Sequence, residues 1–266
     1  MFYPEAPAVL AAEVRAHLAA GQARREAGAG VPKAIIVPHA GYVYSGPVAA
    51  SAYARLAGGR ETIRRVVLFG PAHRVLVRGL ALPSTGAFAT PLGRVAVDRP
   101  AADLALTLRQ VTTNDAAHAL EHSLEVQLPF LQAVLGTFSI VPFAVGDATG
   151  IEVGEVIDLL WGGRETLIVV SSDLSHYHRY ADARRFDRAT GDAILALSAT
   201  LDHEQACGAT PINGLLLAAH RRGLRPELLD LRNSGDTAGD KARVVGYASF
   251  SFTEPEPAER SQVTRS

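Results

Sequence analysis

Histidines follow two apolar runs of the sequence, at the points where buried strands are expected to end. His39 follows "AIIVP", and His73 follows "VVLFGPA". A third run, "TLIVV", ends in "SSDLSHYH", which brings Asp173 and His176 to the corresponding place. Because ligands bind beyond the carboxyl ends of strands in open parallel sheets, we expect these side chains to converge on one site. The alternative is a structural role, in which each histidine separately caps a turn by hydrogen bonds to the backbone.

Two neutral imidazoles at one site would suit a metal ion, which needs a third protein ligand and open positions for water or substrate. The single cysteine, Cys207, lies just before a predicted helix. Backbone amides and the helix dipole at that place would favour its thiolate form. The competing interpretation makes Cys207 a small buried hydrophobe.

A second group of titratable residues lies in "NDAAHALEHSLEVQLPFLQ". On one helix, His118, His122 and Glu125 would share a face, which superficially resembles the spacing of a zinc protease. Such a protease needs a glutamate directly after the first histidine, and alanine stands there. Pro129 favours an interrupted helix, so we expect Glu121, His122 and Glu125 to line the rim of the same site or to cap its loops.

The elements that must position these residues alternate between β-branched runs and longer amphipathic stretches. This alternation is typical of an α/β fold with a central, mostly parallel or mixed sheet flanked by helices. The predicted strands cover 33–37, 64–70, 138–145, 166–170 and 243–252. The predicted helices cover 46–57, 118–135, 151–161, 181–199 and 210–222, after an N-terminal surface helix. Segment 79–98 breaks the rhythm and predicts a hairpin or an irregular excursion.

The composition fits a single domain with a sizeable core. The chain has 266 residues, of which 48% are hydrophobic. Its 26 basic residues balance 27 acidic ones, and no basic stripe indicates nucleic acid as a partner. We place the domain at residues 1–253 and predict a disordered tail over 254–266.

The N-terminus predicts neither a signal peptide nor a membrane span, because charged residues interrupt its apolar run. One cysteine allows no internal disulfide, which fits a cytoplasmic protein. The usual motifs of serine hydrolases, nucleotide hydrolases and dinucleotide-binding proteins are missing from the sequence.

Seven motifs, in their order along the chain, resemble the Memo family, whose bacterial and archaeal members are called AmmeMemoRadiSam system protein B. They are "VPHAGYVYSGPVAASAY", "LFGPAHR", "STGAFATPLGRVAVD", "EHSLEVQLPFLQ", "VVSSDLSHYH", "CGATPINGLL" and "SGDTAGDKARVVGYASF". The resemblance runs from "MFYP" to "YASF", nearly the whole chain. It implies a fold similar to the class III extradiol dioxygenases, with a non-haem iron site.

The resemblance also implies roles for five residues. His39, His73 and Cys207 match the family's metal ligands, with Fe(II) expected and Cu or Zn also suited to these donors. His176 matches a candidate catalytic acid or base, and Asp173 would orient it. The dioxygenases have a carboxylate as third ligand, whereas Cys207 offers a thiolate, which changes metal preference and redox behaviour.

The function implied by the resemblance is a metal-binding, dioxygenase-like redox or modifying protein. It would act on a small molecule or peptide together with a radical SAM enzyme and an AMMECR1-like partner. Two other classes stay open, a peptide or small-ligand binding module without catalysis and a zinc-dependent hydrolase that uses His176 as base. The sequence identifies neither the substrate nor the reaction.

Overall fold

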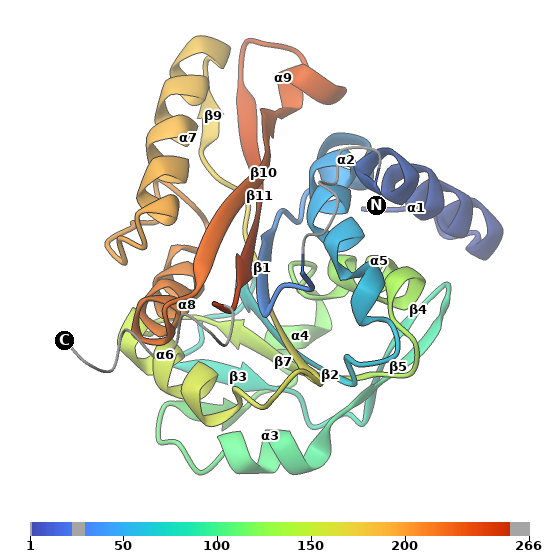
Figure 1. Cartoon of the computed structure of the whole chain (residues 1–266), viewed down its shortest axis with the longest axis vertical. Coiled ribbons are helices and arrows are strands. Elements are labelled where there is room, and N and C mark those ends of the chain that lie inside the picture. The colour runs from blue at the N-terminus through green and yellow to red at the C-terminus, as the bar shows by residue number, and fades with distance from the viewer. Residues whose placement is uncertain (1, 23–29, 256–266) are drawn as a thin grey trace.

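One mixed β-sheet organises the molecule, and helices cover both of its faces (Figure 1). The computed structural model describes residues 2–22 and 30–255. Most of the predicted tail lies outside these residues, so its disorder and the domain boundary at 253 stay predictions. The described residues form a single α/β domain, as the sequence predicts.

The strand order is β10-β11-β1-β8-β2-β7-β3-β6, with β4, β5 and β9 attached beside this path. The strands are β1 (Ala34–Val37), β2 (Arg65–Pro71), β3 (Leu80–Leu82), β4 (Ala87–Thr90), β5 (Gly93–Val97), β6 (Val111–Thr113), β7 (Ser139–Val145), β8 (Thr166–Ser171), β9 (His176–His178), β10 (Arg225–Asn233) and β11 (Val244–Thr253). The α-helices are α1 (Pro7–Gln22), α2 (Tyr42–Tyr53), α3 (Arg99–Ala105), α4 (Ala116–Ala119), α5 (Leu128–Val134), α6 (Gly150–Leu159), α7 (Tyr180–Leu195), α8 (Ala209–Arg222) and α9 (Ser234–Thr237). Two 3₁₀ helices are η1 (Ala54–Gly59) and η2 (Glu125–Gln127).

Four central strands are parallel, which fixes where the site lies. β1 pairs with β8, β8 with β2, and β2 with β7, all in parallel. Nearly every residue of these strands is buried, since helices cover both faces, and this is why their sequences are apolar without alternation. Their carboxyl ends therefore meet at one edge of the sheet.

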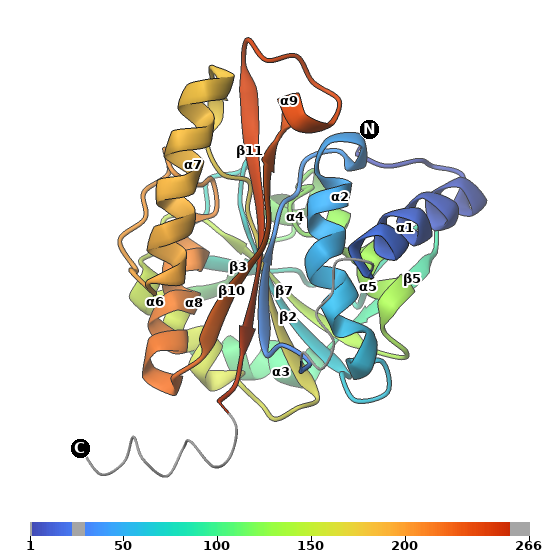
Figure 2. The ribbon, with the colours of Figure 1, turned by 45° about the horizontal axis from the view of Figure 1, so that its top comes forward.

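Two hydrophobic cores lie on the two faces of the sheet. One includes residues of α6 and α8, and the other includes residues of α1, α2 and α5. Figure 2 shows these helices on opposite sides of the strands. No helix in the described part of the chain combines the length and the apolar content needed to span a bilayer.

The five predicted strands are confirmed as β1, β2, β7, β8 and β11, and segment 79–98 contains β3 and the β4–β5 hairpin. Strand β10 was not predicted. It pairs with β11 alone in the main strand order, and most of its residues are only partly buried, so its sequence "RPELLDLRN" lacks the apolar run of a central strand.

The helical stretch predicted at 118–135 is interrupted, as expected from Pro129, but the break lies earlier, at residues 120–124. The segment forms α4, a turn, η2 and α5. In the turn, the Glu121 carboxylate accepts the backbone N–H groups of His122 and Ser123, each at 2.9 Å. A side chain that binds nearby backbone donors competes with helical hydrogen bonding. Pro129 then lies in the first turn of α5, where a proline costs no hydrogen bond.

Candidate metal centre

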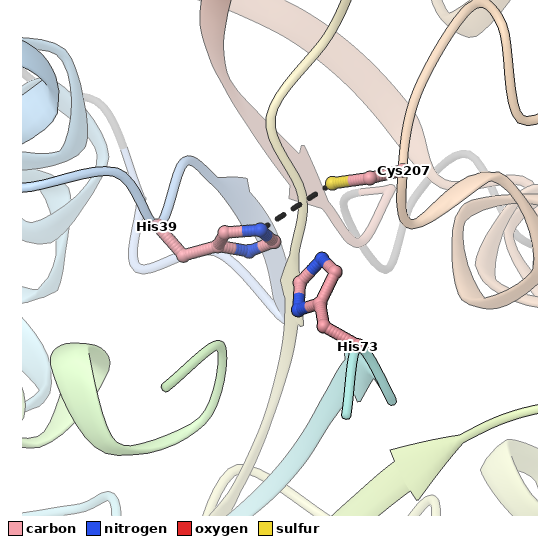
Figure 3. Close-up of side chains that lie close together, drawn as sticks. All are labelled: His39, His73 and Cys207. Carbon is pink, nitrogen blue, oxygen red and sulfur yellow. Dashed lines mark hydrogen bonds between the residues drawn. The ribbon is translucent and has the colours of Figure 1, made fainter. Parts of the chain in front are cut away.

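Three potential metal ligands meet at the carboxyl edge of the sheet (Figure 3). His39 follows β1, His73 follows β2, and Cys207 lies in the loop before α8. One ligand atom from each lies within 4.8 Å of the other two. The His39 Nε2 atom is 3.3 Å from Cys207 Sγ, and the two imidazole centroids are 5.2 Å apart.

The hydrogen bonds around His39 fix its tautomer. Its Nδ1 lies 3.0 Å from the Ser171 hydroxyl. That hydroxyl donates to the Ser123 carbonyl at 2.6 Å and accepts from Gln127 Nε2 at 2.8 Å. The single hydrogen of the Ser171 hydroxyl is therefore already donated to Ser123, so His39 Nδ1 must carry a hydrogen and donate it to Ser171. The Nε2 lone pair of His39 consequently faces Cys207.

Glu121 fixes His73 in the same way. The His73 Nδ1 lies 2.9 Å from Glu121 Oε1, and the carboxylate also accepts the backbone N–H of His73 at 2.6 Å. Burial acts to raise the pKa of Glu121, but its hydrogen bonds from His73 and Ser123 prevail and hold it at about 2. An ionised carboxylate accepts only, so His73 carries its hydrogen on Nδ1 and leaves the Nε2 lone pair for a ligand.

The buried environment keeps the two central groups uncharged. Burial, with a contribution from His73, lowers the pKa of His39 to about 3. Burial and the nearby Asp173 raise the pKa of Cys207 to about 12. The prediction that the helix start favours the thiolate is therefore wrong for the metal-free protein, because the hydrogen bond from the Gly208 N–H does not offset burial.

Asp173 connects the loops that carry two of the candidate ligands. Its Oδ1 accepts the backbone N–H of His39 at 2.8 Å and of Ala40 at 3.3 Å, and its main-chain oxygen accepts the Cys207 N–H at 3.3 Å. His176 opens β9, and its charge interacts with Asp173 and His39. Among the described residues, no hydrogen bond joins Asp173 to His176, so the predicted orienting role stays a prediction.

Aromatic stacking on His122 also supports His73, and the His122 ring lies edge-on to His39 at 5.4 Å. The Phe2 ring stacks on His122 at 4.1 Å and 9°, and His122 stacks on His73 at 5.0 Å and 17°. Burial is the main cause that lowers the pKa of His122 to about 4. Sequence reasoning missed Phe2, and the only signal for it was the "MFYP" start of the family resemblance. Nearby, the Tyr3 hydroxyl donates to Glu125.

Glu121, His122 and His73 could also gather around an ion. The direct hydrogen bond between His73 and Glu121 occupies the space between them, so the carboxylate orients His73 instead. His118 lies elsewhere, with its Nε2 3.0 Å from the Ala81 carbonyl and its ring edge-on to Phe88. The zinc-protease spacing is therefore not realised, because α4 ends before His122.

Comparisons with known proteins show the family of the chain. A family model described as a Memo-like protein matches residues 1–251. The chain belongs to this family. A MEMO1 family protein of Methanosarcina acetivorans is 41% identical over 229 residues, which is 81% of this chain and 84% of the relative. A MEMO1 family protein of Aquifex aeolicus is 36% identical over 237 residues, which is 83% of this chain and 86% of the relative.

The fold is also similar to a solved structure, the crystal structure of uncharacterized protein JW3007 from Escherichia coli K12. The TM-score is 0.52 at 15% sequence identity, and the match covers 81% of this chain and 98% of that chain. At this identity the likeness concerns the fold alone. The family predicted from the motifs is confirmed by the Memo-like model and its relatives.

Proposed function

We propose that this Memo-family protein holds one non-haem iron ion at His39, His73 and Cys207 and acts as a dioxygenase-like redox or modifying enzyme. The observation that carries the proposal is the convergence of three donor atoms within 4.8 Å. Both imidazoles are held by Nδ1 and present Nε2, as is usual for metal-binding histidines with partners behind them.

The donor set fits a divalent transition metal. His39 is neutral and keeps its lone pair, and a bound cation would supply the charge that Cys207 needs to lose its proton. Two nitrogens and one sulfur can hold Fe(II), Cu or Zn, and three protein ligands leave positions open for substrate. Bound iron would supply redox chemistry at that open side.

The raised pKa of Cys207 also argues against a cysteine nucleophile activated by His39. Such a pair needs a thiolate near neutral pH, whereas burial raises the Cys207 pKa to about 12. In our proposal His176 exchanges a proton with the substrate, and Asp173 holds the His39 loop against the Cys207 loop. The family resemblance supports a cytoplasmic protein that works with a radical SAM enzyme and an AMMECR1-like partner.

The test is metal content per chain after anaerobic purification and reconstitution with Fe(II). Wild type should bind one iron, and Cys207→Ser should bind more than about 100-fold more weakly, because loss of a ligand exceeds the 10- to 100-fold cost of losing a residue that orients one. His39→Ala and His73→Ala should behave likewise. His176→Ala should retain metal and serves as the matched control.

Each contrary outcome selects another function. Wild type without metal, or full metal in the three ligand variants, would overturn the metal centre and favour a ligand-binding module. Zinc in protein purified without added metal, together with hydrolytic activity, would favour the hydrolase. Nitric oxide added to the iron form should change its electron paramagnetic resonance spectrum if an open position exists.

A further inference from the structure

The pairing of β9 with β11 brings a buried tyrosine, Tyr247, close to the segment that carries His176. Tyr247 of β11 is only 2% exposed, and its hydroxyl has no hydrogen-bond partner among the described residues. That hydroxyl is nevertheless not one of the fully enclosed atoms without a partner. The small exposed fraction of Tyr247 therefore includes its hydroxyl, which solvent can reach.

Strand pairing places Tyr247 next to the segment that carries Asp173 and His176. The Gly246 N–H donates to the Ser175 carbonyl, and the Gly246 carbonyl accepts from the Leu174 N–H, both at 2.8 Å. One residue further along β11, Tyr247 lies beside Asp173, which interacts with it electrostatically. Asp173 in turn binds the His39 and Cys207 backbones. Tyr247 is thus linked through Asp173 to the loops that carry two of the candidate metal ligands.

Two more tyrosines interact with Tyr247 and are more exposed. Tyr177 is 63% exposed and Tyr44 is 38% exposed, and both interact electrostatically with Tyr247. Tyr177 has a φ of 63°, which costs a non-glycine residue about 1 kcal/mol or more and is frequent at ligand sites. The Arg243 guanidinium lies over the Tyr177 ring, 5.0 Å from its centroid. The strained backbone and the Arg243 contact fix the position of this exposed ring.

We propose that Tyr247, Tyr177 and Tyr44 form a subsite that binds a carboxylate group of the substrate. Phenol hydroxyls donate hydrogen bonds, and none of these three has a partner among the residues that the structure describes. Arg243 adds a positive charge beside them, so the set matches an anionic oxygen better than an ammonium group. The subsite rests on the proposed function, because its ligand is the substrate of that metal centre.

The experiment uses benzoate as the probe and zinc-loaded protein, since zinc is diamagnetic and suits the same donors. Ligand-observed NMR titration gives the dissociation constant. Wild type should bind benzoate and not benzylamine, and Tyr247→Phe should weaken benzoate binding about 10-fold or more, the usual effect of losing a hydrogen bond to a charged group. Tyr177→Phe should weaken it about 3-fold on the same grounds, because this residue is exposed.

Tyr180→Phe is the matched control, because the Tyr180 hydroxyl already donates to Asp236 at 2.5 Å. It should leave benzoate affinity unchanged. If Tyr247→Phe does not fold, Tyr177→Phe decides. Three results would overturn the subsite without affecting the proposed metal centre. Zinc-loaded wild type could fail to bind benzoate, it could bind benzylamine more tightly, or the two variants could bind benzoate as tightly as wild type. Wild type that takes up no zinc and no iron overturns the proposed function, and the subsite with it.

Discussion

Polar groups at the two edges of the sheet differ in how much of their hydrogen-bonding capacity is used. At the amino edge, Lys33 precedes β1 and is 6% exposed. Its ammonium group donates to three carbonyls, those of Trp161 at 2.6 Å and of Gly163 and Thr166 at 2.8 Å. All three of its hydrogens are used, so this cation ties the start of β1 to the start of β8.

At the carboxyl edge, the donor atoms of the candidate metal centre keep unused bonding capacity, with His39 buried, Cys207 half-buried and His73 exposed. His39 Nε2 meets only the weak thiol donor of Cys207, and His73 Nε2 has no hydrogen-bond partner among the described residues. Donor atoms with spare bonding capacity that point at one another indicate a ligand, above all where one of them, in His39, belongs to a buried residue. The comparison teaches that a functional polar group needs both spare bonding capacity and a neighbour aimed at the same point. Spare capacity alone is not enough, because His118 Nδ1 is enclosed without a partner away from the candidate metal centre.

The largest effect on stability is expected at the saturated edge. Lys33→Met keeps most of the apolar stem but removes three donors, and should lower the free energy of unfolding by about 3 kcal/mol. Metal content should not change. Urea denaturation and metal analysis measure both, with the exposed Lys241→Met as control. If Lys33→Met folds but loses its metal, the structural role of the amino edge is not independent of the metal centre at the carboxyl edge.

Acid should destabilise the metal-free protein through the unsaturated edge. The pKa of His39 is lowered to about 3 and that of His122 to about 4, both mainly by burial, against 6.5 for an ordinary histidine. The unfolded chain therefore binds more protons below pH 6.5, and stability falls as the pH decreases, by ~1.4 kcal/mol per pH unit for each histidine.

Urea denaturation between pH 6.5 and 4.5 measures this slope. The window lies above the range in which Glu121, with a pKa of about 2, adds its own loss of stability. His122→Phe keeps a stacked ring but has no titrating group. The free energy of unfolding of this variant should therefore fall with decreasing pH less steeply than that of wild type, by ~1.4 kcal/mol per pH unit. Equal slopes in wild type and variant would show that His122 is not held neutral by the fold.

A smaller effect is expected where a side chain only orients a ligand. Glu121→Gln replaces an acceptor-only carboxylate by an amide that cannot accept both His73 hydrogens, and should weaken metal binding about 10- to 100-fold. Glu125→Gln is the matched control, because Glu125 bonds Tyr3 and not His73. Competition with a chelator gives both affinities, and equal losses in the two variants would contradict the orienting role of Glu121.

The smallest effect is expected from the outer ring of the stack. Phe2→Ala removes the ring that lies 4.1 Å from His122 and should weaken metal binding about 2- to 10-fold, the usual worth of one aromatic contact. Phe88→Ala, which removes a contact with His118 instead, should not alter the affinity. An unchanged affinity in Phe2→Ala would restrict the stack to a packing role. Because Phe2 is the second residue of the chain, the protein used for this measurement should carry its purification tag at the C-terminus.

The sequence by itself determined the central strands and the place of two ligands. Apolar runs such as "AIIV" and "TLIVV" can be satisfied only when both faces of a strand are covered, and parallel strands then end at one edge. His39 and His73 follow two such strands, so local pattern was enough to bring them together. Edge strand β10 carries no such pattern and escaped prediction.

Only the tertiary structure decided how the site is completed. The bond between His39 and Cys207 joins residues 168 positions apart, and Phe2 reaches His122 from the far end of the sequence. The same packing placed the break of the predicted helical stretch at Glu121, because this carboxylate binds both the neighbouring backbone and His73, which is 48 positions away. The packing also raises the pKa of Cys207, where the sequence predicts a lowered one, since burial is a property of the assembled fold. Periodicity encodes which residues are covered, whereas partners and charge states depend on which distant segments do the covering.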